Sequence, residues 1–300
     1  MRVQYYIFKI VVVFFIFSSI VQADEITLSY KDVTLNANLQ LAANKQLADG
    51  VILITHGGLA HNCMEIIVAL QNQLNAHGYS TLAINLSLGL DKRHGMYDCK
   101  VTHRHRNTDA VNEIDTWLGW LNKQGVKQVI LLGHSRGGAQ TALYEAERDN
   151  SMVKSLILMS PAIAENTDAA EYQKRFNMPL QPLLDIAQKR IREGKGDAVI
   201  NFIGLMTCAN TSATADSFTS YYEQSSGLDT PHLIPKFSKP ALIIVAGGDE
   251  IVVGLDKKMT ALVDGNSVQM KVIVGADHLY RDLYTDDAVD VIDTYLKQNK

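Results

Sequence analysis

Short, uninterrupted runs of apolar residues alternate with helical patterns along most of this 300-residue chain. Such runs are typical of strands buried on both faces of a parallel sheet, because a half-exposed strand alternates apolar and polar residues. The expected strands lie at 51–54, 81–86, 129–132, 156–159, 241–245 and 272–274, and the expected helices at 65–77, 108–124 and 138–148. Alternating stretches within 26–39 predict a β-hairpin at the sheet edge. This order predicts an α/β fold in which a mostly parallel sheet carries helices on both faces.

One long interruption separates the strand ending near residue 159 from the strand beginning near residue 241. It contains helical patterns at 169–176, 183–192 and 217–223, and it lacks any strongly apolar β run. A stretch of this length is too long to be a plain loop. We therefore expect a helical lid at 163–235 over the carboxyl edge of the sheet, inserted into a core made of 24–162 and 236–300.

The composition is that of a globular protein with one large core, since 47% of the residues are hydrophobic and 20% are charged. A formal net charge of -4 and a pI near 6.1 create no field that would gather phosphate groups. We therefore expect no nucleic-acid partner.

The N-terminal residues differ in character from the rest of the chain. A short basic and polar start is followed by an apolar run at 10–20 and by small residues before Asp24. This pattern predicts a signal peptide at 1–23 and a periplasmic or secreted mature protein. The run is short for a membrane span, so we expect no stable membrane insertion after cleavage. An uncleaved N-terminal anchor is the alternative, because the two signals are alike.

Export would expose the three cysteines to an oxidising environment, where one disulfide and one free thiol are expected. Cys63 and Cys99 both follow neighbouring strands, and this favours their pairing. Pairings with Cys208 stay open, because spacing does not fix connectivity. No two cysteines have the close spacing of a zinc site, and His103 and His105 lack a third ligand at a defined spacing. We expect no metal and no organic cofactor.

A G-x-S-x-G motif at 133–137 stands directly after an apolar strand and directly before a helix. Glycines at both ends permit a sharp turn, which would lift the Ser135 hydroxyl above the sheet edge. The pattern is weak by itself, but this placement makes it strong evidence for a nucleophilic serine.

A serine hydroxyl needs a general base and a group that orients the base. His278 follows the last strand and Asp249 follows the preceding strand, so both fall at the same sheet edge as Ser135. The order Ser, Asp, His is consistent with a catalytic triad. Glu250 is the more serious rival for the acid, and Asp277 ranks below Asp249 because adjacent loop residues usually point apart.

A tetrahedral intermediate also needs amide donors for its oxyanion. The amide of Arg136, at the start of a helix, is one candidate donor. Gly58 and Leu59, which follow the strand at 51–54, are the candidates for the other, and the sequence does not separate them. His56 is expected to hold this turn through backbone hydrogen bonds.

Together, the His-Gly-Gly loop at 56–58, the serine motif at 133–138, Gly248-Asp249 and Asp277-His278 resemble the α/β-hydrolase superfamily, over residues 48–297. The resemblance implies an eight-stranded sheet, a lid inserted after the sixth strand and an acyl-serine intermediate. The short loop and the lid are similar to the serine esterase and serine aminopeptidase-like branch. We expect a carboxylic ester as a small-molecule substrate; the alternatives are an acyltransferase, an aminopeptidase-like hydrolase and a non-catalytic binding protein.

Two further groups of charged residues bear on the substrate. The loop at 91–107 is expected to form a polar rim of the site whose positive charge favours an anionic substrate; its basic residues are Lys92, Arg93, Lys100, Arg104 and Arg106. The Arg136 guanidinium could reach an acid in the lid or a substrate carboxylate. An aminopeptidase would instead need a lid acid to bind a free amine, for which Glu165, Asp168 and Glu171 are available.

Overall fold

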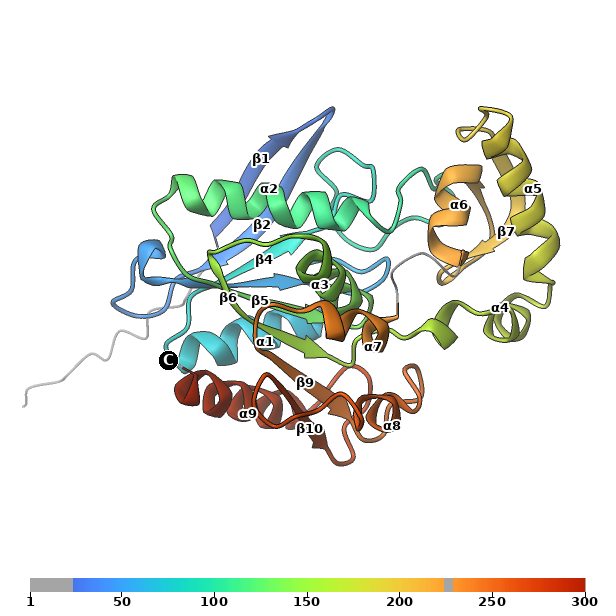
Figure 1. Cartoon of the computed structure of the whole chain (residues 1–300). Helices are drawn as coiled ribbons and strands as arrows, with labels where there is room; N and C mark the ends of the chain where they lie inside the picture. The colour runs from blue at the N-terminus through green and yellow to red at the C-terminus, as the bar shows by residue number, and fades with distance from the viewer. Residues whose placement is uncertain (1–23, 224–228, 300) are drawn as a thin grey trace, which may run out of the picture.

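The computed structural model describes residues 24–223 and 229–299, and its largest element is an eight-stranded sheet (Figure 1). The strand order is β1-β2-β4-β3-β5-β6-β9-β10. The strands are β1 (Asp24–Tyr30), β2 (Val33–Gln40), β3 (Val51–Thr55), β4 (Thr81–Asn85), β5 (Val129–His134), β6 (Val153–Met159), β9 (Ala241–Ala246) and β10 (Val268–Ile273). The two pairings of β2 are antiparallel, and the pairings from β4 to β10 are parallel. The α/β-hydrolase fold expected from the sequence is confirmed.

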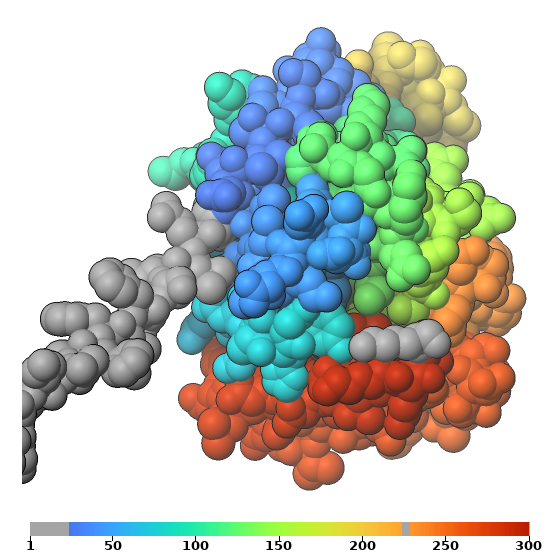
Figure 2. All heavy atoms as spheres, turned by 90° about the vertical axis from the view of Figure 1, so that its left-hand side faces the viewer, coloured from blue at the N-terminus to red at the C-terminus, as the bar shows by residue number. Residues whose placement is uncertain are grey.

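Alternate residues of the buried strands face two separate hydrophobic clusters, because side chains in a strand point to opposite faces. One cluster lies under α2 (Asp109–Lys123) and α3 (Arg136–Glu147). The other lies under α1 (Glu65–Ala76) and α9 (Tyr284–Gln298), which adjoin on the opposite face (Figure 2). The sheet is thus covered on both sides. Two shorter helices lie at the edges of this core, η1 (Leu47–Asp49) and α8 (Leu255–Met259).

The last strand differs from its predicted position, since β10 ends at Ile273 and Val274 is 85% exposed. The apolar run at 272–274 therefore marks the end of the strand and the turn that follows it.

The segment between β6 and β9 forms a cap at one end of the sheet (Figure 1). Its elements are η2 (Ala164–Thr167), α4 (Ala169–Phe176), α5 (Leu180–Arg192), β7 (Val199–Leu205), β8 (Cys208–Thr214), α6 (Ala215–Tyr222), α7 (Thr230–Leu233) and η3 (Ile234–Lys236). The prediction of a helical lid is incomplete, because β7 and β8 form an antiparallel pair. The apolar residues of β7 (VINFIGL) were a strand signal that the prediction missed, whereas Asn, Ser and Thr replace regular apolar alternation in β8.

The predicted disulfide between Cys63 and Cys99 is wrong. Cys99 is bonded to Cys208 in β8, with a Cα–Cα distance of 5.3 Å, and Cys63 is an exposed free thiol. The loop after β4 runs to the cap, where His103 and Ala213 form a bridge with hydrogen bonds on both sides. The loop thus brings Cys99 to a hairpin that the sequence did not reveal, and the bond is one of the pairings with Cys208 that the spacing left open.

The predicted signal peptide at 1–23 lies outside the described residues and stays a prediction. Within 24–223 and 229–299, no helix combines the length and the apolar character needed to cross a membrane.

Candidate active site

Ser135 lies in a strained turn between β5 and α3, with a φ of 57° and a ψ of -125°. A positive φ is unfavourable for a residue with a side chain, and such strain is often found at functional sites. The two motif glycines make the turn possible through close packing. A Cβ on Gly133 would collide with Gly137, and a Cβ on Gly137 would collide with the carbonyl groups of Thr55 and His56. The sequence thus places the serine hydroxyl at the carboxyl edge of the sheet.

The structure brings the three predicted site residues together. The imidazole Nε2 of His278 lies 2.8 Å from Ser135 Oγ, and its Nδ1 lies 2.8 Å from Asp249 Oδ2. Both rivals for the acid lie elsewhere, since Glu250 is exposed and Asp277 pairs with Arg281 at 3.0 Å. The geometry therefore selects Asp249 as the partner of the histidine.

The environment of Asp249 keeps its carboxylate ionised. Burial by itself raises the pKa of Asp249, but the hydrogen bond and charge of His278 lower it, as do the amides of Ile251 and Val252. The result is a pKa of about 2. An ionised Asp249 accepts a hydrogen bond from Nδ1, which leaves Nε2 free to accept the proton of Ser135.

His134, the residue before Ser135, holds the loop that carries His278. Its Nε2 lies 2.8 Å from the backbone carbonyl of His278, so this nitrogen carries the proton and donates. Burial, with the nearby His278 as a smaller cause, lowers the pKa of His134 to about 4, so the ring is neutral at pH 7. We did not assign this role from the sequence, because His134 occupies a variable position of the motif.

Three backbone amides near Ser135 are free to receive negative charge. The loop of Gly58 and Leu59 passes over the nucleophile, since a Cβ built on Gly57 would lie 2.8 Å from the Ser135 Cβ. Among the described residues, the amides of Gly58, Leu59 and Arg136 donate to no protein acceptor. The Arg136 amide also stands at the N-terminus of α3, where partial positive charge collects. These amides remain the candidate oxyanion donors, and their role stays a prediction.

A buried hydrogen-bond network supports this loop from behind. His56 Nε2 lies 3.1 Å from the amide of Leu86 and 3.2 Å from Nη2 of Arg93. The Leu86 amide and the Arg93 guanidinium both donate a hydrogen bond to Nε2. This nitrogen therefore carries no proton, and His56 is neutral. Burial, assisted by the charge of Arg93, lowers its pKa to about 3. Arg93 is 5% exposed, so its predicted place on a basic rim is wrong; it packs inside because the carbonyls of Ala60, Leu86 and Gly95 accept its hydrogen bonds.

The cap side of the site contains a chain of neutral polar rings. His103 Nδ1 lies 3.0 Å from His105 Nε2, and His105 Nδ1 lies 2.7 Å from the Tyr221 hydroxyl. Burial lowers the pKa of His103 to about 4 and that of His105 well below its ordinary value. The described residues contain no cluster of three or more His, Cys, Asp or Glu that could hold a metal. These histidines therefore act as structural hydrogen-bonding groups between loop and cap.

The three cap acids considered for binding an amine all have structural partners. Glu165 pairs with Lys258 at 2.5 Å, and Glu171 pairs with Arg175 at 2.7 Å. Asp168 accepts the Glu171 amide and so caps α4.

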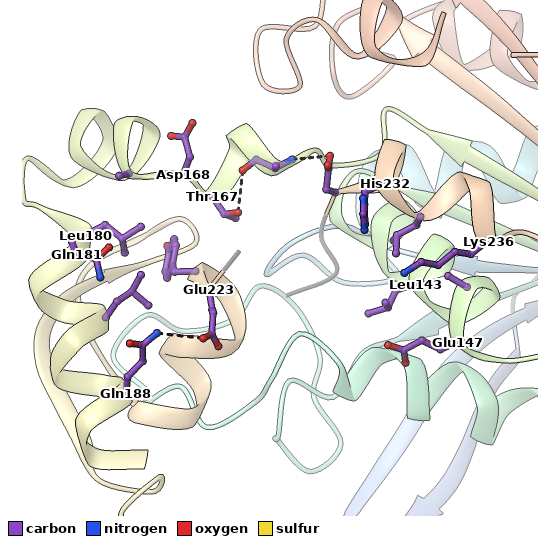
Figure 3. A pocket seen from close by; sticks show the side chains of 17 residues that line it. Leu143, Glu147, Thr167, Asp168, Leu180, Gln181, Gln188, Glu223, His232 and Lys236 are labelled. Carbon is purple, nitrogen blue, oxygen red and sulfur yellow. Dashed lines mark hydrogen bonds between the residues drawn. The ribbon is translucent and has the colours of Figure 1, made fainter. Parts of the chain in front are cut away.

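A cavity of about 910 Å³ lies between the cap and the core (Figure 3). Its walls come from α5 and α6 on one side and from α3 and α7 on the other, with Gln188 and Glu223 joined by a hydrogen bond. Ser135, Asp249 and His278 do not line it. It is therefore a feature of the cap–core seam and is separate from the triad.

The family model described as "Serine aminopeptidase, S33" (Hydrolase_4) matches residues 46–282. The chain belongs to this family. The match includes the serine motif, Asp249 and His278 and the whole cap, so this S33 family member has its site within the matched region. A search of curated proteins gives no match.

Solved α/β-hydrolases share the fold of this S33 family member at low sequence identity. Est1E from Butyrivibrio proteoclasticus is 20% identical, with a TM-score of 0.65, over 92% of this chain and 98% of Est1E. A monoacylglycerol lipase from Paleococcus ferrophilus is 16% identical, with a TM-score of 0.61, over 89% of this chain and 99% of the lipase. Mouse alpha/beta hydrolase domain-containing protein 10 is 16% identical, with a TM-score of 0.61, over 93% and 100% of the two chains. At identities of 16–20%, these similarities show a shared fold.

Proposed function

We propose that this protein is a serine hydrolase that cleaves a carboxylic ester through an acyl-serine intermediate. The observation that carries the proposal is the continuous chain from Ser135 through His278 to Asp249, with both contacts at 2.8 Å. The amides of Gly58, Leu59 and Arg136 have no protein acceptor among the described residues, and Gly57, which precedes Gly58, packs directly against Ser135. A nucleophile, a base with its orienting acid and an oxyanion site are the groups that acyl transfer requires.

In the acylation step, Ser135 Oγ attacks the ester carbonyl carbon and His278 Nε2 takes the hydroxyl proton. The carbonyl electrons move onto the oxygen, where the amides of Arg136 and of Gly58 or Leu59 stabilise the negative charge. Asp249 stabilises the imidazolium that forms. When the carbonyl re-forms, the C–O bond to the alcohol breaks and the alcohol oxygen takes the proton from His278.

In the deacylation step, water takes the place of the alcohol. His278 removes a proton from the water as its oxygen attacks the acyl carbon, and the same amides stabilise the second oxyanion. The bond to Ser135 Oγ then breaks, and the proton held by His278 returns to the serine. The products are a carboxylic acid and the free enzyme, so the reaction consumes one water and needs no cofactor.

The choice of an ester over a peptide has two supports. Est1E is also solved as "Ferulic Acid bound to Est1E", with a TM-score of 0.67 and 20% identity over 91% of this chain and 98% of that one. In addition, the three cap acids that could bind a peptide amine are engaged in structural contacts. The family description names aminopeptidases, so peptide cleavage and acyl transfer are outcomes that the test must separate.

The test combines active-site labelling with turnover. We expect a fluorophosphonate probe to label the protein from Asp24 onward, and labelling to vanish in Ser135→Ala and His278→Ala. We expect the wild type to hydrolyse p-nitrophenyl esters in preference to aminoacyl p-nitroanilides, without a rise in rate when an alcohol acceptor is added. Circular dichroism checks that each variant is folded. A folded wild type that is neither labelled nor active contradicts the proposal and favours a binding function.

We also propose that the protein is exported to the periplasm or secreted. The apolar N-terminal pattern supports this, and the disulfide between Cys99 and Cys208 is consistent with it, because disulfides persist mainly in oxidising compartments. Expression with and without residues 1–23, followed by fractionation and N-terminal sequencing, tests the proposal. Retention of the full chain in the cytosol contradicts it.

A further inference from the structure

The guanidinium of Arg136 lies between the nucleophile turn and the underside of the cap. Arg136 follows Ser135 directly, and consecutive Cα atoms are about 3.8 Å apart. Its side chain extends to the cap, where the guanidinium carbon lies 5.4 Å from the centre of the Tyr221 ring in α6. A group held by this guanidinium would thus be separated from the backbone of Ser135 by little more than the length of one arginine side chain.

This guanidinium has no anionic partner among residues 24–223 and 229–299. Its Nη1 is buried without any hydrogen-bond partner, and no carboxylate within those ranges forms an ion pair with it. Two other arginines in the same region are satisfied. Arg93 makes five hydrogen bonds, and Arg175 contacts Glu171 and the carbonyl of Met206. Of these three arginines, Arg136 alone has a buried guanidinium nitrogen without a partner among the described residues.

The neighbours of Arg136 do not compensate its charge. The Tyr221 ring offers a cation–π contact, which is weaker than a paired carboxylate. His105, bonded to that tyrosine, is neutral and carries no negative charge. Burial lowers the pKa of Arg136, and the positive charge of Arg175 adds to this effect, yet a guanidinium stays protonated at pH 7. Arg136 as a whole is half-buried, but its Nη1 is fully enclosed. An enclosed charged group is costly unless an anion pairs with it, so a ligand is the natural source of that anion.

We propose that the Arg136 side chain binds a carboxylate carried by the acyl part of the substrate, so that the preferred substrates are half-esters of short dicarboxylic acids. This inference rests on the proposed function, because it assigns the substrate class of the same site. The planar guanidinium can donate two parallel hydrogen bonds to a carboxylate and fix its position relative to the scissile carbonyl. The role is distinct from that of the Arg136 amide, which faces the oxyanion.

The test compares two esters with the same leaving group, p-nitrophenyl hemiglutarate and p-nitrophenyl butyrate. The readout is the ratio of their kcat/KM values, because any effect of a substitution on the Arg136 amide cancels in it. We expect Arg136→Gln to lower this ratio by tenfold or more, at roughly the strength of a charge-assisted hydrogen bond. Arg136→Lys keeps the charge but loses the planar guanidinium with its two parallel donors. Its ratio should therefore fall between the ratios of wild type and Arg136→Gln. Arg148→Gln is the matched control, because Arg148 is an exposed arginine at the opposite end of the same helix, α3.

Calorimetry with glutarate and the uncharged glutaramide gives a readout that does not depend on turnover. We expect wild type to bind glutarate and not glutaramide, and Arg136→Gln to lose that binding. A ratio in Arg136→Gln within twofold of wild type overturns the proposal, and so does an equal change in Arg148→Gln. If folded wild type hydrolyses neither ester, the proposed function fails and calorimetry decides alone: glutarate binding that requires Arg136 supports the site, and no binding overturns it.

Discussion

A buried carboxyl group on α2 should make the stability of the protein fall as the pH rises. Glu113 is 2% exposed and accepts hydrogen bonds from the amide of Ser87 at 2.8 Å and from its hydroxyl at 2.5 Å. Burial raises the pKa of Glu113 from 4.5 to about 7, although these hydrogen bonds and the charge of Arg93 oppose the shift. These hydrogen bonds join α2 to the turn after β4. Ser87 follows Leu86 there, and the Leu86 amide contacts His56.

The sign follows from proton binding in the two states. Between its unfolded and folded pKa values, Glu113 binds more protons in the folded state, so the free energy of unfolding decreases as the pH rises. The stability contribution is fully present below pH 4.5 and is lost as the pH rises through about 7. At about 1.36 kcal/mol for each pKa unit, the wild type should lose roughly 2.5 kcal/mol between pH 5 and pH 8 from this group.

Glu113→Gln removes this dependence while keeping the size of the side chain. Urea unfolding at pH 5, 6, 7 and 8 gives the free energy of unfolding of both proteins, and the other titrating groups cancel in the difference. We expect the variant to gain roughly 2.5 kcal/mol relative to wild type over that range. Asp115→Asn, at an exposed position of the same helix, is the control and should show a constant difference. A constant difference for Glu113→Gln as well would show that Arg93 keeps Glu113 ionised, and it would refute the argument.

Three further predictions concern the site and the cap. Asp249→Asn should lower kcat by roughly a thousandfold or more, because the imidazole loses both its orientation and the nearby negative charge. The kcat of Glu250→Gln should stay within twofold of wild type, and ester kinetics measure both variants. His134→Ala should lower kcat/KM about tenfold or more, since a buried carbonyl of His278 loses its donor, and recovery in His134→Gln would exclude a purely steric cause. Replacing Cys99 and Cys208 together by Ser should lower the free energy of unfolding by about 4–5 kcal/mol, which is the chain-entropy value for a closed loop of this length. Cys63→Ser removes a free thiol and should leave the free energy of unfolding unchanged. Urea unfolding measures both.

The core of the fold follows closely from the sequence, because its signals are local. Buried parallel strands need continuous apolar runs, and β3, β5 and β9 carry them. The positions of Ser135 and Asp249 are also local information, since Ser135 directly follows β5 and Asp249 follows β9 by three residues. His278 follows β10, a half-exposed edge strand, by five residues, and a short apolar run at the end of that strand was enough to locate it. Knowing that the strands are parallel then places all three at one edge.

The parts that could not be predicted depend on contacts distant in sequence. Within the hairpin, β8 has a weak pattern of its own, and it is held by Cys99 and His103 from another segment. The burial of Arg93 likewise depends on carbonyl groups that only the folded loop brings around it. A charged residue in a polar loop gives no local sign that it will be enclosed.

The loop after β4 explains how the cap and the nucleophile turn come to form one site. Near its start, Arg93 supports the loop that carries the oxyanion amides, through His56. Further along, Cys99 and His103 attach it to β8, and His105 contacts Tyr221, whose ring lies over Arg136. One segment therefore contacts the oxyanion loop, the cap hairpin and the cap helix that faces the proposed carboxylate site. Because these contacts share one loop, a change that frees the cap should also disturb the position of Arg136, and cleaving the disulfide should alter the preference for half-esters as well as the stability.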